Sequence, residues 1–152
     1  MSKNKLGTDL VCQVGVIVHD VEKTAKAWAT LLGVDVPTWK MTDAKETSHI
    51  NLRGESTDAR AKLAFLSLGD QVQLELIEPV GEPSTWAEFL KEHGQGIHHI
   101  AFHLKGMDEV IARLEAHNIT TIQRGDYTGG RYGYMDGVEE LGVILELLEN
   151  FD

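Results

Sequence analysis

One pattern occurs twice in this chain, and it restricts the possible fold more than any other feature of the sequence. Residues 74–78 read LELIE and residues 145–149 read LELLE. An apolar, β-rich segment precedes each of them, at residues 12–18 and 96–104, and the second of these reads GIHHIAFHL. Alternating character of this kind predicts half-buried strands. We therefore expect a duplicated unit, in which each copy places two polar side chains at equivalent positions.

The segments between the repeated strands complete the pattern. Strand signals occur at residues 10–18, 62–68, 71–77, 97–104, 120–124, 131–136 and 143–148. Helical spacing of apolar residues predicts helices over 21–32 and 107–117, and Asp20 and Gly33 are suited to begin and end the first of them. The expected buried stripe of that helix is Ala25, Trp28, Ala29 and Leu32.

Two regions do not fit the repeat. The patterning weakens over residues 34–58, where we expect one short strand within 39–50 and a turn or mobile loop over 53–58. Residues 79–95 form a linker with one short helix, which Ser84 is suited to begin. Each copy then has the order βαβββ.

The predicted fold class is therefore α+β. Two βαβββ modules, residues 10–78 and 96–149, would form one curved mixed sheet around a metal-binding cleft. At 152 residues, the whole chain (1–152) is expected to be a single domain.

Composition excludes several classes of function. The net charge of −10 disfavours nucleic acid as a partner, because phosphate binding needs clustered Lys and Arg. The single cysteine, Cys12, cannot form an internal disulfide and is typical of a reducing compartment. The polar N-terminus does not resemble a signal peptide, and no stretch approaches the roughly 20 apolar residues of a membrane span. We expect a soluble cytoplasmic protein with no membrane association.

Four polar residues lie at equivalent places in the repeat. Gln13 and His99 are on the first strand of each module, and Glu75 and Glu146 are on the last. Taken singly, each would more often be a hydrogen-bonded core residue. Four of them at matched positions favour a shared site, and their nitrogen and oxygen donors suit Zn, Ni, Co, Mn or Fe(II).

Other polar residues have weaker cases. His103 shares the face of His99, and Tyr132 and Tyr134 share one face of their strand, so all three could contact a substrate or simply pack. Strict alternation puts His98 on the face opposite His99, where a structural role is expected. The remaining residues considered are expected to be solvated or to mark strand ends: Arg124, Arg131, Glu78 and Glu149.

The duplication, GIHHIAFHL and the GVILELLE ending resemble the vicinal oxygen chelate superfamily, which includes glyoxalase I, methylmalonyl-CoA epimerase, bleomycin-resistance proteins and extradiol dioxygenases. The resemblance implies that Gln13, Glu75, His99 and Glu146 are metal ligands. It also places Lys62 at the position nearest to a catalytic glutamate of the epimerase, and we expect Lys62 to contact substrate. The glutathione-binding arginine and asparagine of glyoxalase I would fall on Ile17 and Pro79, which argues against a glutathione-based substrate.

The expected activity is that of a metal-dependent lyase, isomerase or epimerase. A divalent ion would stabilise an enediolate of a small carbonyl substrate, and Glu75 and Glu146 would serve as the catalytic proton acceptors and donors. The alternative is a metal-free protein that sequesters a small molecule, as in bleomycin resistance. An Fe(II) dioxygenase needs two histidines and one carboxylate, and Gln13 counts against it. The resemblance also implies a homodimer.

Overall fold

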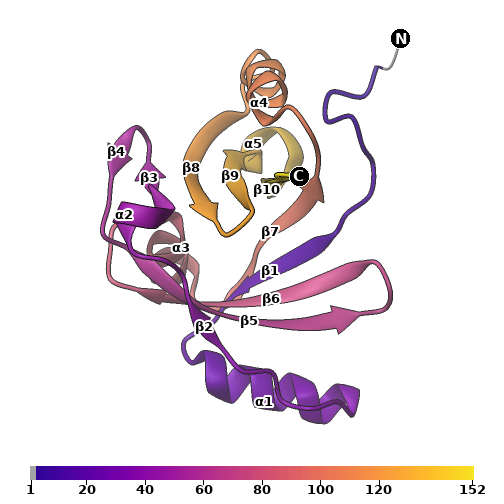
Figure 1. Cartoon of the computed structure of the whole chain (residues 1–152), viewed down its shortest axis with the longest axis vertical. Helices are drawn as coiled ribbons and strands as arrows, with labels where there is room; N and C mark the ends of the chain where they lie inside the picture. The colour runs from indigo at the N-terminus through magenta and orange to yellow at the C-terminus, as the bar shows by residue number, and fades with distance from the viewer. Residues whose placement is uncertain (1–2) are drawn as a thin grey trace.

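The computed structural model describes residues 3–152 and contains one ten-stranded sheet with the strand order β2-β5-β6-β1-β7-β10-β9-β8-β3-β4. The sheet is strongly curled, and helices α1 and α4 lie at opposite ends of the molecule (Figure 1). The predicted α+β fold with a curved mixed sheet is confirmed.

The elements follow the chain as two halves. The first half comprises β1 (Gln13–Ile17), α1 (Val21–Leu32), β2 (Lys40–Met41), α2 (Lys45–Ser48), β3 (Asn51–Leu52), β4 (Glu55–Ser56), β5 (Arg60–Leu68) and β6 (Val72–Val80). Helix α3 (Thr85–His93) connects it to the second half. The second half comprises β7 (Gly96–His103), α4 (Met107–Glu115), β8 (Thr120–Tyr127), β9 (Gly130–Asp136), α5 (Val138–Leu141) and β10 (Ile144–Asn150).

The two halves share one strand arrangement. The first strand of each pairs in parallel with the last, β1 with β6 and β7 with β10. The last strand of each then pairs antiparallel with the strand before it, β6 with β5 and β10 with β9. Strands β1 and β7 join the halves as an antiparallel pair at the centre of the sheet. The first and last strands of both halves are therefore four neighbours, β6-β1-β7-β10.

Helix α1 begins and ends where the sequence predicts. The Asp20 side chain accepts a hydrogen bond from the Lys23 amide, and Gly33 adopts the left-handed conformation with φ of 69° that ends the helix. Its buried residues are Val21, Ala25 and Ala29, whereas Leu32 is 39% exposed. The predicted stripe was therefore one position too long. No helix within residues 3–152 is long and apolar enough to span a membrane.

The terminal glutamates of the repeated strands are not solvated strand ends. Glu78 Oε1 accepts a hydrogen bond from the Val21 amide at 2.8 Å, at the start of α1. Glu149 Oε2 accepts one from the Gly106 amide at 2.7 Å, at the start of α4. Because the first amides of a helix have no partner within it, each carboxylate compensates the N-terminus of the helix in its own half. The prediction for these two residues was wrong.

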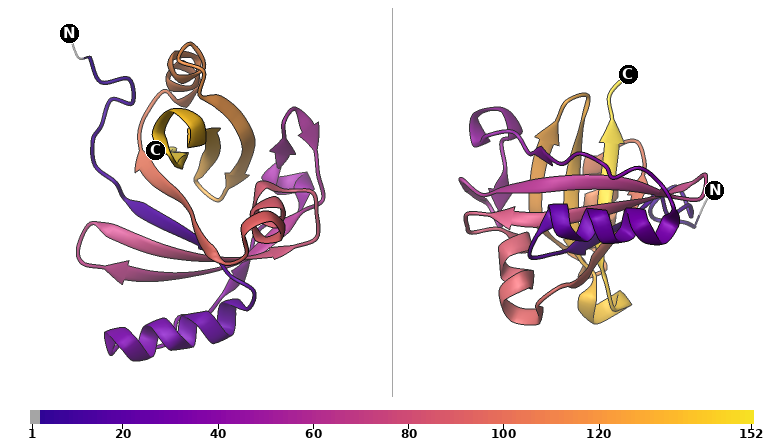
Figure 2. Two further views of the ribbon diagram at one scale, coloured as in Figure 1. Left: turned by 180° about the vertical axis from the view of Figure 1, so that it is seen from behind. Right: turned by 90° about the horizontal axis from the view of Figure 1, so that it is seen from below.

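Residues 51–56 form a hairpin. Of the turn or mobile loop predicted over 53–58, residues 53–54 are the turn of this hairpin and 57–58 have no regular structure, whereas 55–56 form a strand. Strands β3 and β4 pair with each other, and β3 also pairs with β8 of the second half, Asn51 opposite Arg124 and Leu52 opposite Gln123. The connection through α2 therefore carries the chain from the edge strand β2 of one half to the far edge of the other, as both views in Figure 2 show. Turn residues Arg53 and Gly54 have φ of 49° and 93°, as two-residue hairpins require.

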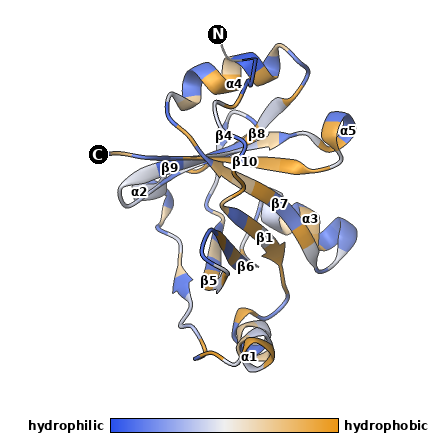
Figure 3. Ribbon diagram, turned by 90° about the vertical axis from the view of Figure 1, so that its right-hand side faces the viewer, coloured by the Kyte–Doolittle hydropathy of each residue, from blue (hydrophilic) through white to orange (hydrophobic). Residues whose placement is uncertain are grey.

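The core has three clusters. One lies under α1, a second lies under α4, and a third lies between the halves around Ile17, Trp86 and Tyr134. Strand β1 is accordingly largely apolar in Figure 3, β7 has both apolar and polar segments, and α1 and α4 each have an apolar and a polar side. The third cluster contains residues of both halves and therefore packs them against each other.

Candidate metal centre

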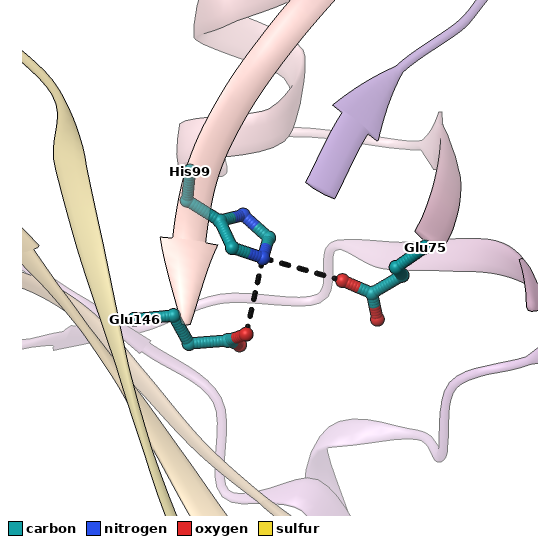
Figure 4. Close-up of side chains that lie close together, drawn as sticks. All are labelled: Glu75, His99 and Glu146. Carbon is teal, nitrogen blue, oxygen red and sulfur yellow. Dashed lines mark ion pairs between the residues drawn. The ribbon is translucent and has the colours of Figure 1, made fainter. Parts of the chain in front are cut away.

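Four side chains from the four central strands meet at one point. His99 Nε2 lies 3.1 Å from Glu146 Oε1 and 3.5 Å from Glu75 Oε1 (Figure 4). Gln13 Oε1 lies 3.3 Å from the same nitrogen. The potential ligand atoms of Glu75, His99 and Glu146 are all within 4.8 Å of one another, and all four residues are buried. The sequence prediction that these residues converge agrees with the structure.

The Gln13 amide has two possible orientations, which exchange the places of its oxygen and its nitrogen. Gln13 Nε2 donates to Gln73 Oε1 at 2.9 Å, and the opposite amide atom lies 2.8 Å from Glu146 Oε1 and 3.3 Å from Glu75 Oε1. An oxygen among carboxylate oxygens needs a cation to be stable there. Rotating the amide would instead let Nε2 donate to both carboxylates, which suits the site without a cation. A bound cation would favour the orientation with the oxygen inward, and the two carboxylates alone favour the orientation with the nitrogen inward.

A β-bulge explains how two neighbouring histidines both reach the interior. Along the β1–β7 pair, Gly15 is opposite His99 and Val16 is opposite Ile97, so His98 is the extra residue of the bulge. A bulge disrupts strict alternation, and His98 and His99 lie with their Nδ1 atoms 2.9 Å apart. The prediction that His98 faces away from His99 was therefore wrong.

Gly15 provides the space for the His99 ring. A Cβ at Gly15 would lie 2.0 Å from His99 Cε1 and 2.4 Å from His99 Nε2. The imidazole therefore lies directly over the backbone of the neighbouring strand. Any larger residue at position 15 would have to displace the ring.

The site has a strongly negative environment. Burial lowers the pKa of His99, but the Glu146 and Glu75 carboxylates more than offset this and raise it to about 9. Burial raises the pKa of the Glu75 carboxyl above its ordinary value. Without a metal, His99 is therefore an imidazolium cation at neutral pH and compensates the charge of the two carboxylates. A bound metal ion would compensate that charge in its place.

The donor set fits a divalent cation. One imidazole nitrogen, one amide oxygen and two carboxylates are ligands that Zn, Ni, Co, Mn and Fe(II) accept. No identity of the metal follows from these residues, since several first-row ions bind such sets.

The four residues lie at a cavity of about 460 Å³, to which Gln13, Glu75 and Glu146 contribute. The other predicted residues that line it are His103, Tyr132 and Tyr134. Lys62 does not line it. Its ammonium group lies 3.5 Å from Glu78 Oε2 and 4.7 Å from the centre of the Trp39 ring, while Leu63 and Phe65 of the same strand face the cavity.

Sequence reasoning missed several residues of the cavity. Gln73 holds the Gln13 amide, and Trp86 lines the wall with its Nε1 donating to Tyr134 at 3.0 Å. Lys40 and Asp43 come from the region whose patterning was weak. For Gln73 a signal existed, because it lies two residues before Glu75 and hence on the same face of β6.

Comparisons with known proteins agree with this architecture. The sequence model described as Glyoxalase/Bleomycin resistance protein/Dioxygenase superfamily matches residues 12–134. An uncharacterized protein of Bacillus subtilis (strain 168), YqjC, is 34% identical over 95 residues, which cover 60% of this chain and 67% of that protein. A crystal structure of methylmalonyl-CoA epimerase from Mycobacterium tuberculosis has a similar fold, with a TM-score of 0.67 at 23% identity over 97% of this chain and 93% of that one. A methylmalonyl-CoA epimerase in complex with methylmalonyl-CoA and NH4+ gives 0.66 at 22% identity, over 93% and 94% of the two chains.

Proposed function

Because this chain belongs to the glyoxalase/bleomycin resistance/dioxygenase superfamily, we propose that it is a divalent-metal-dependent isomerase or lyase that removes a proton next to a carbonyl group. The observation that carries the proposal is the convergence of Gln13 Oε1, His99 Nε2 and the two carboxylates at one cavity. Gln13, Glu75, His99 and Glu146 would hold the metal. When bound, the metal supplies Lewis-acid stabilisation of negative charge on the substrate's carbonyl oxygen.

The chain's own residues would move the proton. Glu75 and Glu146 lie on β6 and β10, which flank the central β1–β7 pair on opposite sides. One carboxylate takes the proton from the carbon next to the carbonyl, and either carboxylate returns it. Return to the opposite face of the carbon inverts it, and return to another atom isomerises the substrate. Such acid–base help is typically worth about 10²–10⁴-fold in rate.

The walls of the cavity would orient the substrate and exclude water. Trp86, Tyr132 and Tyr134 supply flat apolar surfaces, and His103 supplies a polar group. Lys40 also lines the cavity and provides a cation for a carboxylate or phosphate of the substrate. The similarity of fold to methylmalonyl-CoA epimerases supports acyl-CoA thioesters as the first substrate class to test. Ile17 lies fully in the core, which supports a substrate other than glutathione.

The first test is the metal content of protein purified without a histidine tag. We expect about one divalent ion per chain, as the four-ligand site predicts, and its loss in His99→Ala. Asp58→Asn is the control, because Asp58 is a largely exposed carboxylate that pairs with Lys45 away from the site. If neither the purified protein nor protein supplied with Zn, Ni, Co or Mn holds metal, the enzyme proposal fails and a metal-free ligand-sequestering protein becomes the better explanation.

The second test is deuterium exchange from solvent into the carbon next to the carbonyl, measured by mass spectrometry on acyl-CoA thioesters and hydroxy-ketones. We expect exchange with the wild-type metal-loaded protein, and a fall of about 10²-fold or more in Glu146→Gln and Glu75→Gln. Exchange that persists unchanged in both variants would contradict the assigned roles. The predicted homodimer is tested by light scattering on the same preparations.

A further inference from the structure

A buried chain of polar groups runs from the candidate metal centre to the connecting helix α3. His99 Nδ1 lies 2.9 Å from His98 Nδ1, and His98 Nε2 lies 3.1 Å from Thr85 Oγ1. All three side chains are buried, with residue exposures of 0%, 1% and 4% for His99, His98 and Thr85. Each hydrogen bond in the chain has one donor and one acceptor, and because the three side chains are buried, bulk solvent does not replace a missing partner.

Once the hydrogen on the His99 ring is placed, the positions of the other hydrogens in this chain follow. For Nε2 of His99 to offer its lone pair to a cation, Nδ1 of the same ring must carry the hydrogen. His98 Nδ1 must then accept that hydrogen bond, which leaves the hydrogen of the neutral His98 ring on Nε2. Nε2 then donates to the Thr85 hydroxyl. With a cation at His99 Nε2, only this arrangement is possible. The Thr85 hydroxyl stabilises it by accepting the hydrogen of His98 Nε2, which would otherwise be buried without a partner.

We propose that His98 and Thr85 are positioning residues that select the tautomer and ring orientation of His99 needed to bind metal at Nε2. The inference rests on the proposed metal-dependent function and adds to it a role for residues that do not touch the cavity. Groups that donate to or accept from the second nitrogen of a ligating histidine commonly act in this way.

Thr85 and His98 are themselves held in place. The Thr85 amide donates to Gln123 Oε1 at 2.9 Å, and Gln123 Nε2 donates to the hydroxyl of Tyr132 at 3.1 Å. The His98 ring lies between Phe89 and Tyr134, with ring centres 5.4 Å and 5.0 Å away. The chain thus links helix α3, strand β8 and a residue of the cavity wall to the ligand.

The direct test is the tautomeric state of His98 by ¹⁵N nuclear magnetic resonance of the metal-free protein and of the protein with Zn²⁺ added. We expect His98 to carry its hydrogen on Nε2 in both states, because His99 Nδ1 donates to it in both. A hydrogen on Nδ1 of His98 would overturn the inference. This readout does not depend on activity, so it remains informative whatever the substrate.

Two substitutions at position 85 separate positioning from packing. Thr85→Val keeps the shape but removes the acceptor, which leaves His98 free to adopt the other tautomer, and we expect Zn²⁺ affinity to fall by about 10-fold or more. Thr85→Ser keeps the hydroxyl, and we expect affinity within a few-fold of wild type. If the residue only fills space, the order is reversed, with Val retaining affinity and Ser losing it.

A second pair of variants, at position 98, tests the inference independently of whether the variants at position 85 fold. His98→Asn keeps an acceptor near the place of Nδ1, while His98→Leu removes it at similar size, so affinity should fall more in Leu than in Asn; circular dichroism checks that both fold. Equal affinities in the two variants would overturn the inference. A wild-type protein that binds no metal would overturn the proposed function, whereas wild-type binding that Thr85→Val leaves unchanged would overturn this inference alone.

Discussion

The two halves of the molecule share a strand arrangement but differ in how they hold their ligands. In the first half, Gln13 is oriented by Gln73, a neighbour on the parallel strand β6. In the second half, His99 is oriented by His98, which a bulge brings to the same side of its own strand. The comparison teaches that the shared strand arrangement supplies the matched positions. Local features that the halves do not share, a glutamine pair in one and a bulge in the other, orient the donor atoms.

The residues opposite the ligands differ in the same way. His99 lies opposite Gly15 across the β1–β7 pair, and Gln13 lies opposite Ala101. The His99 imidazole lies over the backbone of Gly15 and leaves no room for a Cβ there. The extended Gln13 side chain leaves room for the Cβ of Ala101. The bulkier ligand, His99, thus lies opposite a glycine, and the slimmer ligand, Gln13, lies opposite an alanine.

The largest difference between the halves is expected when these two small residues are exchanged, one at a time, and metal binding is measured. In Gly15→Ala the new Cβ would meet the His99 ring at 2.0 Å, so the ring must move and metal binding should be lost. Isothermal titration with Zn²⁺ measures this. The control is Ala101→Gly at the matched position, which should keep metal binding and lose only about 0.5–1 kcal/mol of folding stability. Full metal binding in Gly15→Ala would show that the ring has another place to go.

The next largest difference is expected between α1 and α4, in how much each helix contributes to the free energy of unfolding. Helix α4 buries large side chains, including Leu114 at 5% exposure, whereas α1 buries mainly alanines and leaves Leu32 at 39%. Leu114→Ala should reduce the free energy of unfolding by about 2–5 kcal/mol. Leu32→Ala should reduce it by less than about 1 kcal/mol, because little of its surface is buried. Urea denaturation of both variants provides the measurement, and equal losses would contradict the difference described here.

A smaller effect is expected where the first half is tied to α3. Arg53 donates two hydrogen bonds to the Glu88 carboxylate, at 2.9 and 3.0 Å. Both side chains are partly exposed, so a double-mutant cycle of Arg53→Ala and Glu88→Ala should give a coupling of about 0.2–1 kcal/mol in urea denaturation. A coupling near zero would mean that strand pairing with β8 alone holds the hairpin.

The smallest expected effect is a loss of local stability at the start of α4 as the pH falls. The hydrogen bond from Arg131 holds the pKa of the Glu149 carboxyl below its ordinary value. A lowered folded-state pKa contributes stability that is present above the ordinary carboxyl range and is lost as the pH falls through the lowered value. Amide hydrogen exchange at Gly106 should therefore quicken as the pH falls through that range, after correction for the pH dependence of intrinsic exchange. Glu149→Gln should show no such step, and an unchanged step in that variant would assign it to another group.

Much of the fold could be predicted from the sequence because it depends on local patterns. Asp20 and Gly33 delimit α1 as expected, and the repeated LELxE strands identified both carboxylates of the site. The bulge at His98 could not be predicted, because alternation is the rule that a bulge breaks. The hairpin of β3 and β4 was also missed, since its strands have two residues each and are stabilised by pairing with β8.

Strand β3 also bears on how the molecule folds. It belongs by sequence to the first half, yet its neighbour in the sheet is β8 of the second, and the connection to it leaves from the opposite edge at β2. A chain with this connectivity cannot finish either half on its own, because each lacks an edge that the other supplies. We therefore expect one cooperative unfolding transition, and fragments cut between the halves should gain full structure only when mixed. Each half of the chain would then depend on the other for its final structure, although both lie in one polypeptide.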